Sequence, residues 1–526
     1  MRILLCATHP NSSNGYSKIA YELAKYLSTK NDIELTYFGF QNFQKNPQHE
    51  KARELPANIQ VYDAFANEVN KQLGFGFDQI GDFVTMNKPD LIIIYNDMVV
   101  VSNIIDKLNK IENKKFKIAI YMDQVYLCQK KEHIKILNDH ADFVICFSKY
   151  WEQIAKEQGI TKPTGVLEHG FSPMLHYPVP KKLARMFFNL KMDDFIIINA
   201  NRNQPRKRLD LMMMAFAEVV SRHTAEPIKL LIATAPTGAW NLIEIYEREL
   251  RIRGLTLEEG MKHIIFIDNP QALTDEDMNT LYNTSDIGIN TCSGEGWGLT
   301  NFEGGSMSIP QIVPNIGGFR DFLDKDCAIL IEPKIKLYTD MTIDGCPGCA
   351  EICDAMDFAD AIDQYYADED MRKLHGENAR KKIINNYKWN DLGEKLYTYI
   401  TTILGVEPQV IHKNKISIDE INLLSENLKT NINIDTIDDN VKESNETKVE
   451  PTKVEPPPIK KNDIKSRLQA KLAKRKAEAN SVKKNKITVV SQSSSAKHDS
   501  DSDDDLDMDK EKLLKLQSKI NKLLAK

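Results

Sequence analysis

Two glutamates stand eight positions apart in the stretch EGWGLTNFEGG, which runs from Glu295 to Gly305 and carries four glycines. Glycine is a poor helix former with a bare backbone, so packing alone rarely selects so many of them. The glycines that precede a predicted helix start near Thr300 leave amide groups exposed, which is typical of anion-binding sites. The spacing of Thr300 and Glu303 also fits a capping box, the structural alternative for Glu303.

Two cations stand five positions apart in the stretch INANRNQPRKRLDL, where Arg202 and Lys207 follow a predicted buried strand. At the C-terminal end of a strand they suit a diphosphate that becomes more negative as it leaves. An exposed basic turn is the alternative interpretation, because Arg and Lys are common at protein surfaces.

The elements that position these residues alternate between short β-branched segments and segments with helical periodicity, from Met1 to about Gly405. This alternation is typical of parallel sheets covered by helices. It breaks at VLEHGFSPMLHYPVPKKL, whose three prolines indicate a domain connection, and then restarts. We therefore predict two successive α/β domains, with ligands bound at the C-terminal ends of their strands.

Taken together, these stretches resemble the donor-binding half of the group 1 retaining glycosyltransferases, also called glycosyltransferase family 4. The family motif of an Arg, four residues and a Lys corresponds to Arg202 and Lys207, and its Glu, seven residues, Glu motif corresponds to Glu295 and Glu303. The strand lead YNTSDIGIN and the turn SIPQIVPNIGGFRD also match, in the family's order. The resemblance covers about the first 405 residues and is strongest from Ile196 to Gly318.

The resemblance implies the α/β fold called GT-B, in which two Rossmann-like domains face a cleft. Residues 1–172 are then the acceptor-side domain and residues 173–385 the nucleotide-sugar donor domain. Residues 386–408 would form a C-terminal helix that packs back on the first domain. Residues 409–526 are predicted to be a mostly disordered tail because they are polar and charged with few aromatics.

The resemblance also implies roles for the motif residues. Arg202 and Lys207 would hold the donor pyrophosphate and stabilise the departing diphosphate, so that neither a metal ion nor a cofactor is needed. Glu303 would accept hydrogen bonds from the ribose hydroxyls, and Glu295 would contact the donor sugar as a catalytic residue. The other donor-binding residues expected in this stretch are Gly296, Trp297, Gly298, Leu299 and Thr300.

The first domain departs from the family pattern in two places. The family's glycine-rich loop after the first strand is reduced to Gly15 in THPNSSNGYSK. Where many members carry a histidine beside the donor sugar, the strand KIAIYMDQVY offers Asp123, which we expect to take that catalytic place. His9 and His133 are weaker candidates, and His169 is expected to have a structural role.

The function implied is transfer of a sugar, of the hexosyltransferase type, from a nucleotide-diphosphate sugar to a hydroxyl of a glycan, lipid or protein acceptor. One alternative keeps the fold but changes the chemistry, to a sugar-nucleotide epimerase or hydrolase. Another is a catalytically weak, transferase-like scaffold that recruits partners through its tail. Turnover of the donor separates these alternatives.

The composition predicts a cytoplasmic protein. No apolar run approaches the roughly 20 residues that span a bilayer, and MRILLCATHP suits a first strand better than a signal peptide. Peripheral membrane contact through a basic face of the first domain stays open. Five cysteines scattered among apolar segments fit reduced, buried thiols, whereas CPGCAEIC reads as a loop without the fourth ligand of a zinc site.

The tail combines a basic stretch from Lys460 to Lys486 with an acidic one from Asp499 to Asp509. The basic stretch lacks the interleaved aromatics of a nucleic-acid binder, so we expect a protein partner rather than nucleic acid. The last residues, KEKLLKLQSKINKLLAK, have heptad-like spacing that suits a partner-docking helix, with a frayed, solvated tail as the alternative.

Overall fold

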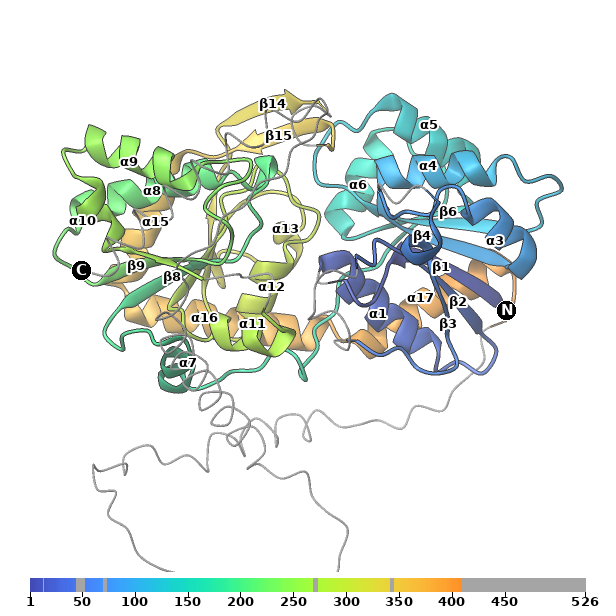
Figure 1. Ribbon diagram of the computed structural model, residues 1–526, viewed down its shortest axis with the longest axis horizontal. Coiled ribbons are helices and arrows are strands. Elements are labelled where there is room, and N and C mark those ends of the chain that lie inside the picture. Colours follow the sequence, from blue (N-terminus) through green and yellow to red (C-terminus); the bar gives the residue numbers. More distant parts are fainter. Residues whose placement is uncertain (13, 44–52, 70–72, 268–272, 341–344, 408–526) are drawn as a thin grey trace, which may run out of the picture. The chain divides into compact units, whose positions relative to one another are not determined.

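The computed structural model describes residues 1–12, 14–43, 53–69, 73–267, 273–340 and 345–407 (Figure 1). The predictions for the tail, residues 409–526, lie outside the described residues. Among the described residues, no helix is both long and apolar enough to cross a membrane.

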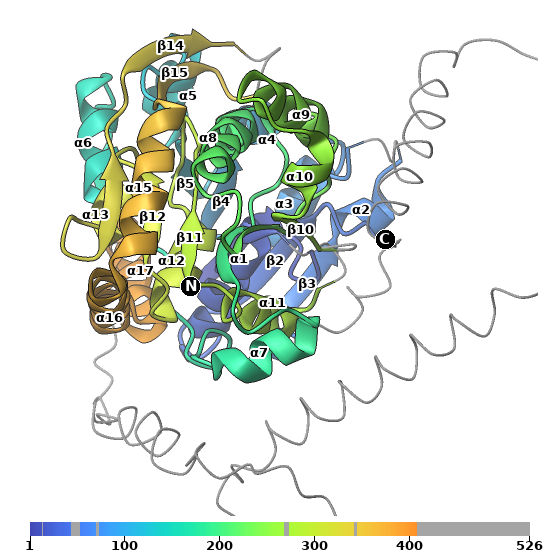
Figure 2. The same cartoon turned by 90° about the vertical axis from the view of Figure 1, so that its left-hand side faces the viewer.

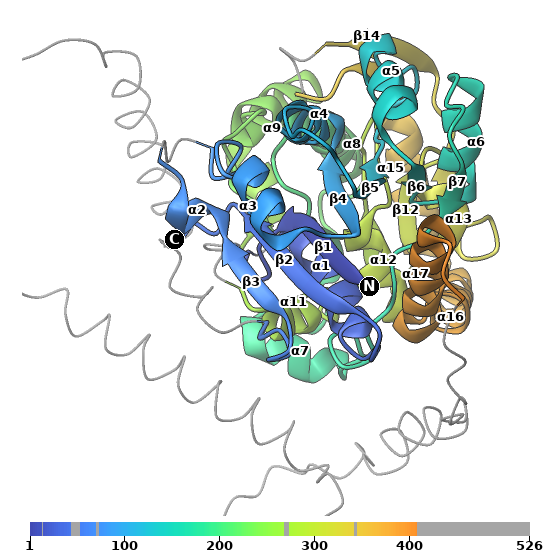
Figure 3. The same ribbon diagram turned by 90° about the vertical axis from the view of Figure 1, so that its right-hand side faces the viewer.

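The first half of the described chain, which we call the N-lobe, is built on a seven-stranded parallel sheet in the order β3-β2-β1-β4-β5-β6-β7 (Figure 3). A parallel sheet covered on both faces needs strands that are apolar throughout, and the Leu91–Asp97 strand LIIIYND is buried in all but its last residue. The strands are β1 (Arg2–Thr8), β2 (Glu34–Phe40), β3 (Gln60–Asp63), β4 (Leu91–Asp97), β5 (Lys117–Asp123), β6 (Phe143–Cys146) and β7 (Thr164–Val166).

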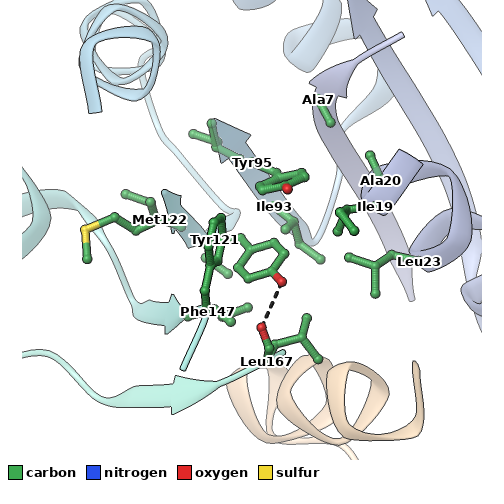
Figure 4. Packing of buried hydrophobic residues seen from close by; sticks show 14 of the residues in the cluster. Ala7, Ile19, Ala20, Leu23, Ile93, Tyr95, Tyr121, Met122, Phe147 and Leu167 are labelled. Atoms are coloured by element: carbon green, nitrogen blue, oxygen red, sulfur yellow. Dashed lines mark hydrogen bonds between the residues drawn. The ribbon is translucent and has the colours of Figure 1, made fainter. Parts of the chain in front are cut away.

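Helices between these strands carry buried residues on one side, as α1 does with Ile19, Leu23 and Leu27. Figure 4 shows this packing around Tyr121, whose hydroxyl donates a hydrogen bond to the Leu167 carbonyl at 2.8 Å. The helices are α1 (Gly15–Leu27), α2 (Ala64–Asn67), α3 (Ile80–Asn87), α4 (Met98–Leu108), α5 (Lys131–His140) and α6 (Lys149–Glu157).

The second half, the C-lobe, is built on a six-stranded parallel sheet in the order β10-β9-β8-β11-β12-β13. Its strands are β8 (Phe195–Asn199), β9 (Ile228–Ile232), β10 (Ile264–Phe266), β11 (Ile287–Ile289), β12 (Gln311–Pro314) and β13 (Ala328–Ile331). Its helices are α7 (Lys181–Phe188), α8 (Leu209–Arg222), α9 (Leu242–Ile252), α10 (Leu257–Met261), α11 (Asp275–Tyr282), α12 (Leu299–Ser306), α13 (Phe319–Phe322), α15 (Ala355–Ala367) and α16 (Glu369–Asn386). The prediction of two successive parallel α/β domains is confirmed.

Strand β8 shows how the C-lobe sheet is covered on both faces. Phe195 and Ile197 pack in the cluster formed with α8, α9 and α15, which lie side by side in Figure 2. Ile196 and Ile198 point the other way, into a second cluster with residues of α11. This alternation follows from the two-residue period of a strand, and it fixes the direction in which the loop after β8 leaves the sheet.

Two further elements connect to the N-lobe. Helix α17 (Trp389–Leu404) packs against α1: Gly393 lies so close to the Tyr26 ring that a Cβ there would be 2.1 Å from it, and Lys30 pairs with Glu394 at 2.6 Å. The antiparallel hairpin β14 (Ile335–Thr339) and β15 (Gly348–Ile352) contacts the loop after β5, where the Cys349 amide donates to the Leu127 carbonyl at 2.8 Å. The prediction of a loop at CPGCAEIC is therefore wrong, because five of these eight residues belong to strand β15.

Candidate functional site

The central feature of the site is a direct ion pair between Lys207 and Glu295. Lys207 ends the 3-10 helix Pro205–Lys207 in the loop after β8, and Glu295 lies in the loop after β11. Strands β8 and β11 are parallel neighbours, so both loops leave the same edge of the sheet. Hydrogen bonds from the Thr291 hydroxyl to the Lys207 and Arg208 carbonyls, at 3.2 and 2.9 Å, join the loops.

Both partners of this pair are buried, with 8% of Lys207 and 7% of Glu295 exposed. Burial raises the pKa of Glu295, but the charges of Lys207 and Arg206, with a smaller contribution from Arg202, hold it below its usual value. The side chain of Arg202 itself is exposed. The predicted basic loop after β8 is present, and the charges of Lys207, Arg206 and Arg202 all act on the Glu295 carboxylate.

Asp123 comes to this site from the N-lobe. It ends strand β5, and its carboxylate lies against Gly296, where a Cβ would be 2.2 Å from Oδ1. The Tyr16 hydroxyl donates to its other oxygen at 2.5 Å. Burial raises the pKa of Asp123 to about 6, against the opposing effects of the Tyr16 hydrogen bond and the Arg206 charge.

Gly15, the other residue singled out in the first domain, begins helix α1 and lies against Leu299 of α12. A Cβ on Gly15 would be 2.7 Å from the Leu299 side chain. The structure therefore places both N-lobe candidates, Gly15 and Asp123, against the stretch that runs from Glu295 to Glu303.

Glu303 lies on α12 with 5% of its surface exposed. The N-cap of α12 is Gly298, which has no side chain to cap with, so the capping-box interpretation is wrong. The Glu303 carboxylate instead meets Lys18 of the N-lobe at 3.0 Å, the Tyr282 hydroxyl at 3.1 Å and His176 at 3.4 Å. Burial raises the pKa of Glu303, but Lys18 and His176 outweigh it and hold the pKa far below its usual range.

The glycines of the motif allow backbone to pack on backbone. Gly298 has φ +99°, a conformation that L-residues with side chains rarely adopt. Gly318, in the turn after β12, lies against Gly296, whose carbonyl oxygen would be 2.3 Å from an added Cβ. This carbonyl also accepts a hydrogen bond at 2.8 Å from the indole of Trp151, which belongs to the N-lobe.

Trp297 and Thr300 differ from the other expected donor-binding residues. The Trp297 ring is 2% exposed and packs against Phe302, Phe322 and Tyr387, so only its backbone faces the motif loop. The Thr300 hydroxyl is partly exposed and lies 3.4 Å from the Asn201 side-chain oxygen.

The segment that contains these residues matches a known protein family. Residues 181–382 match the family model described as glycosyl transferases group 1, and they contain both the Arg202–Lys207 and the Glu295–Glu303 motifs. The match to the group 1 glycosyltransferases therefore lies in the C-lobe.

Curated relatives of the chain include two D-inositol 3-phosphate glycosyltransferases. The one from Corynebacterium urealyticum is 24% identical over 213 residues, which are 40% of this chain and 44% of the relative. The one from Rhodococcus erythropolis is 28% identical over 146 residues, 27% of this chain and 30% of the relative. The matched part of the chain thus spans less than half the length of these relatives.

Solved structures resemble a larger part of the chain. A sucrose-phosphate synthase from Thermosynechococcus elongatus has a TM-score of 0.58 at 16% identity, covering 77% of this chain and 99% of that one. Anabaena Alr3699/HepE in complex with UDP-glucose has a TM-score of 0.57 at 14% identity, covering 76% and 100%. This likeness confirms the GT-B fold with its two parallel-sheet domains.

Several residues of the site were not found by sequence reasoning. Tyr16 and Lys18 follow Gly15 on α1, and their proximity to that glycine was the available signal. Arg206 stands inside the basic loop that was singled out. Trp151 lies in an ordinary amphipathic helix, so no pattern in the sequence marks its hydrogen bond to Gly296.

The histidine and cysteine predictions have mixed outcomes. His169 is buried among Phe147 and Trp297, and burial lowers its pKa to about 3. His9 and His133 are also buried, which lowers the pKa of each. Cys128 is exposed, contrary to the expectation that the scattered thiols are buried. Within the described ranges, no three His, Cys, Asp or Glu side chains are grouped as a metal site.

Proposed function

We propose that this protein transfers a sugar from a nucleotide-diphosphate sugar to an acceptor hydroxyl, with retention of the anomeric configuration. The observation that carries the proposal is the buried Lys207–Glu295 pair at the C-terminal ends of β8 and β11, inside the segment that matches the family. A diphosphate and a sugar hydroxyl are natural replacement partners for this ammonium and this carboxylate.

In this proposal Lys207 binds the diphosphate, and Arg202 and Arg206 add charge around it. Negative charge grows on the diphosphate as the glycosidic bond breaks, so fixed cations there stabilise the transition state more than the ground state. The cations supply the charge that a divalent metal supplies in other transferases, so the proposed reaction uses neither a metal ion nor a cofactor. The acceptor hydroxyl attacks from the side of the leaving group, assisted by a donor phosphate oxygen.

The carboxylates recognise hydroxyl groups in the same proposal. Glu295 accepts hydrogen bonds from the donor sugar, and Glu303 accepts them from the ribose. Asp123 approaches from the N-lobe, and its contact with Gly296 supports a role beside the sugar and the incoming acceptor. Gly15 lets the start of α1 approach Leu299 of α12, and we assign its backbone a place beside the donor phosphates.

The identity of the donor and acceptor is a matter for assay. HepE in complex with UDP-glucose makes UDP-glucose the first donor to test, and the names of the curated relatives make inositol phosphates natural acceptors alongside glycans, lipids and proteins. A cytoplasmic location, peripheral membrane contact and a protein partner of the tail stay predictions.

The test uses the full chain with UDP-, GDP- and ADP-sugars, with and without an acceptor panel, and measures release of the nucleoside diphosphate. Lys207→Met is the test variant, and Lys135→Met, whose side chain is 75% exposed on α5, is the matched control. We expect release from one donor in wild type and control but not in Lys207→Met. The anomeric configuration of the product by NMR checks retention.

Two results would contradict the proposal. Release without a transferred product would favour the hydrolase alternative. Failure of every donor to be consumed or to bind would favour a scaffold.

A further inference from the structure

Lys18 of the N-lobe contacts two carboxylates of the C-lobe at once. Its ammonium lies 3.0 Å from Glu303 Oε1 and 3.3 Å from Asp275 Oδ1, and its side chain is 20% exposed. Burial lowers the pKa of Lys18, but the two carboxylates more than compensate and hold it above its usual value, so Lys18 is an ammonium here. Two anions therefore compete for one cation at the point where the lobes meet.

Asp275, the first residue of α11, is fixed by a second cation of the N-lobe. Arg53 donates to both of its carboxylate oxygens, at 2.9 and 3.1 Å. The same guanidinium donates to the Pro10 and Ser12 carbonyls in the loop that leads into α1. Asp275 is thus held in place by Arg53 as well as by Lys18.

Glu303 already has three partners. Lys18 and His176 meet Oε1, and the Tyr282 hydroxyl donates to Oε2. Because Lys18 and His176 both lie against Oε1, a ribose hydroxyl that binds this oxygen competes with the Lys18 ammonium, which is the nearer of the two. Tyr282 is 2% exposed and cannot withdraw without opening the core, whereas Lys18 has a flexible four-carbon stem.

We propose that Lys18 is a positioning residue that moves from Glu303 to Asp275 when the donor nucleotide binds, so that the ribose hydroxyls take the place it leaves. This inference rests on the proposed function. It assigns to the N-lobe a part in nucleotide affinity, through a residue that does not touch the reacting atoms. Asp275 receives the ammonium, so the exchange never leaves a buried charge unpaired.

The proposed movement of Lys18 predicts opposite changes in nucleotide affinity for two variants. Lys18→Met frees Glu303, so the ribose has no ammonium to displace, and we expect about tenfold tighter nucleotide binding, the value of one charge-assisted hydrogen bond. Asp275→Asn removes the second partner, so Lys18 stays on Glu303, and we expect about tenfold weaker binding. Lys18→Arg keeps a cation between the same two carboxylates and should stay within about threefold of wild type.

The test is calorimetric titration of the full chain with UDP, GDP and ADP. Lys25→Met, an exposed lysine on the same helix, is the matched control. Each ribonucleotide is compared with its 2′-deoxy form, because the gain in Lys18→Met should shrink when a ribose hydroxyl is missing. A purely structural role for Lys18 would not distinguish the two sugars. Lys18→Gln replaces Lys18→Met if the latter does not fold.

Tighter binding in Lys18→Met, weaker binding in Asp275→Asn and an unchanged control would support the exchange. If wild type binds a nucleotide but Lys18→Met binds it equally or more weakly, the inference is overturned while the proposed function stands. If wild type binds none of the three nucleotides, the proposed function fails, and the inference fails with it.

Discussion

Removing either partner of the Lys207–Glu295 pair should destabilise the protein, and the two losses should differ in size. Breaking a buried ion pair by deleting one partner costs about 3–5 kcal/mol, because the remaining charge stays buried. Lys207→Met leaves Glu295 with the Arg206 and Arg202 charges nearby, so we expect a loss near the lower end, about 3 kcal/mol. Glu295→Gln leaves the three cations facing one another, so we expect about 5 kcal/mol.

The assay is urea unfolding of the full chain at pH 7, followed by tryptophan fluorescence, with Trp297 as a buried reporter beside Glu295. The double variant Lys207→Met/Glu295→Gln should lose less stability than Glu295→Gln alone, since one of the three cations is gone. A larger loss in Lys207→Met than in Glu295→Gln would refute the claim that the arginines share the carboxylate. Losses below about 1 kcal/mol in both would refute burial of the pair.

Three further outcomes are expected. Between pH 3.8 and about 6, the Asp123 carboxyl binds more protons in the folded protein than in the unfolded chain, so the free energy of unfolding falls as pH rises through this window. Asp123→Asn should remove this loss. In urea unfolding we expect this variant to be more stable than wild type by at most about 3 kcal/mol at pH 8 and equally stable below pH 4. Gly318→Ala should lower kcat/KM because an added Cβ would push the Gly296 carbonyl away, and this loss should be larger than the loss of folded protein, measured by the urea midpoint, can explain. A kcat/KM equal to that of wild type would contradict this contact. Hydrogen peroxide should join Cys128 and Cys349 in a disulfide while the peroxide is reduced to water, since Cys128 is near enough to add to the rise that burial causes in the Cys349 pKa; mass spectrometry of non-reduced peptides detects the link, and Cys128→Ser should prevent it.

The part of the site that lies within one sheet could be predicted from the sequence. Arg202, Lys207 and Glu295 each follow a short apolar segment, and parallel strands bring the residues after their C-terminal ends to one edge. The longer strands were found for the same reason, since an apolar run of five to seven residues is a strong local signal. Within the N-lobe sheet, the two strands that the sequence pattern does not mark are the short edge strands β3 and β7.

Contacts between distant segments were not predictable in the same way. Nothing in the local pattern of α1 indicates that Lys18 meets Glu303, 285 residues later, because this contact depends on how two separately folded lobes meet. The hairpin of β14 and β15 was missed because four of the five residues of β14 are exposed and show no alternation of burial. The capping box failed because the N-cap of α12 is Gly298, two residues before Thr300, which places Thr300 inside the helix.

Each carboxylate of the motif is paired with a lysine, and the two lysines come from different lobes. Glu295 pairs with Lys207 of its own lobe, so a donor can exchange both partners at once, with its diphosphate on the lysine and its sugar on the glutamate. Glu303 pairs with Lys18 of the opposite lobe, and the ribose offers hydroxyls for the glutamate but no anion for the lysine. A displaced ammonium must then find another anion or water, and Asp275 is the carboxylate within reach. If the proposed exchange holds, nucleotide affinity depends on an aspartate that the donor does not touch and on a lysine of the N-lobe.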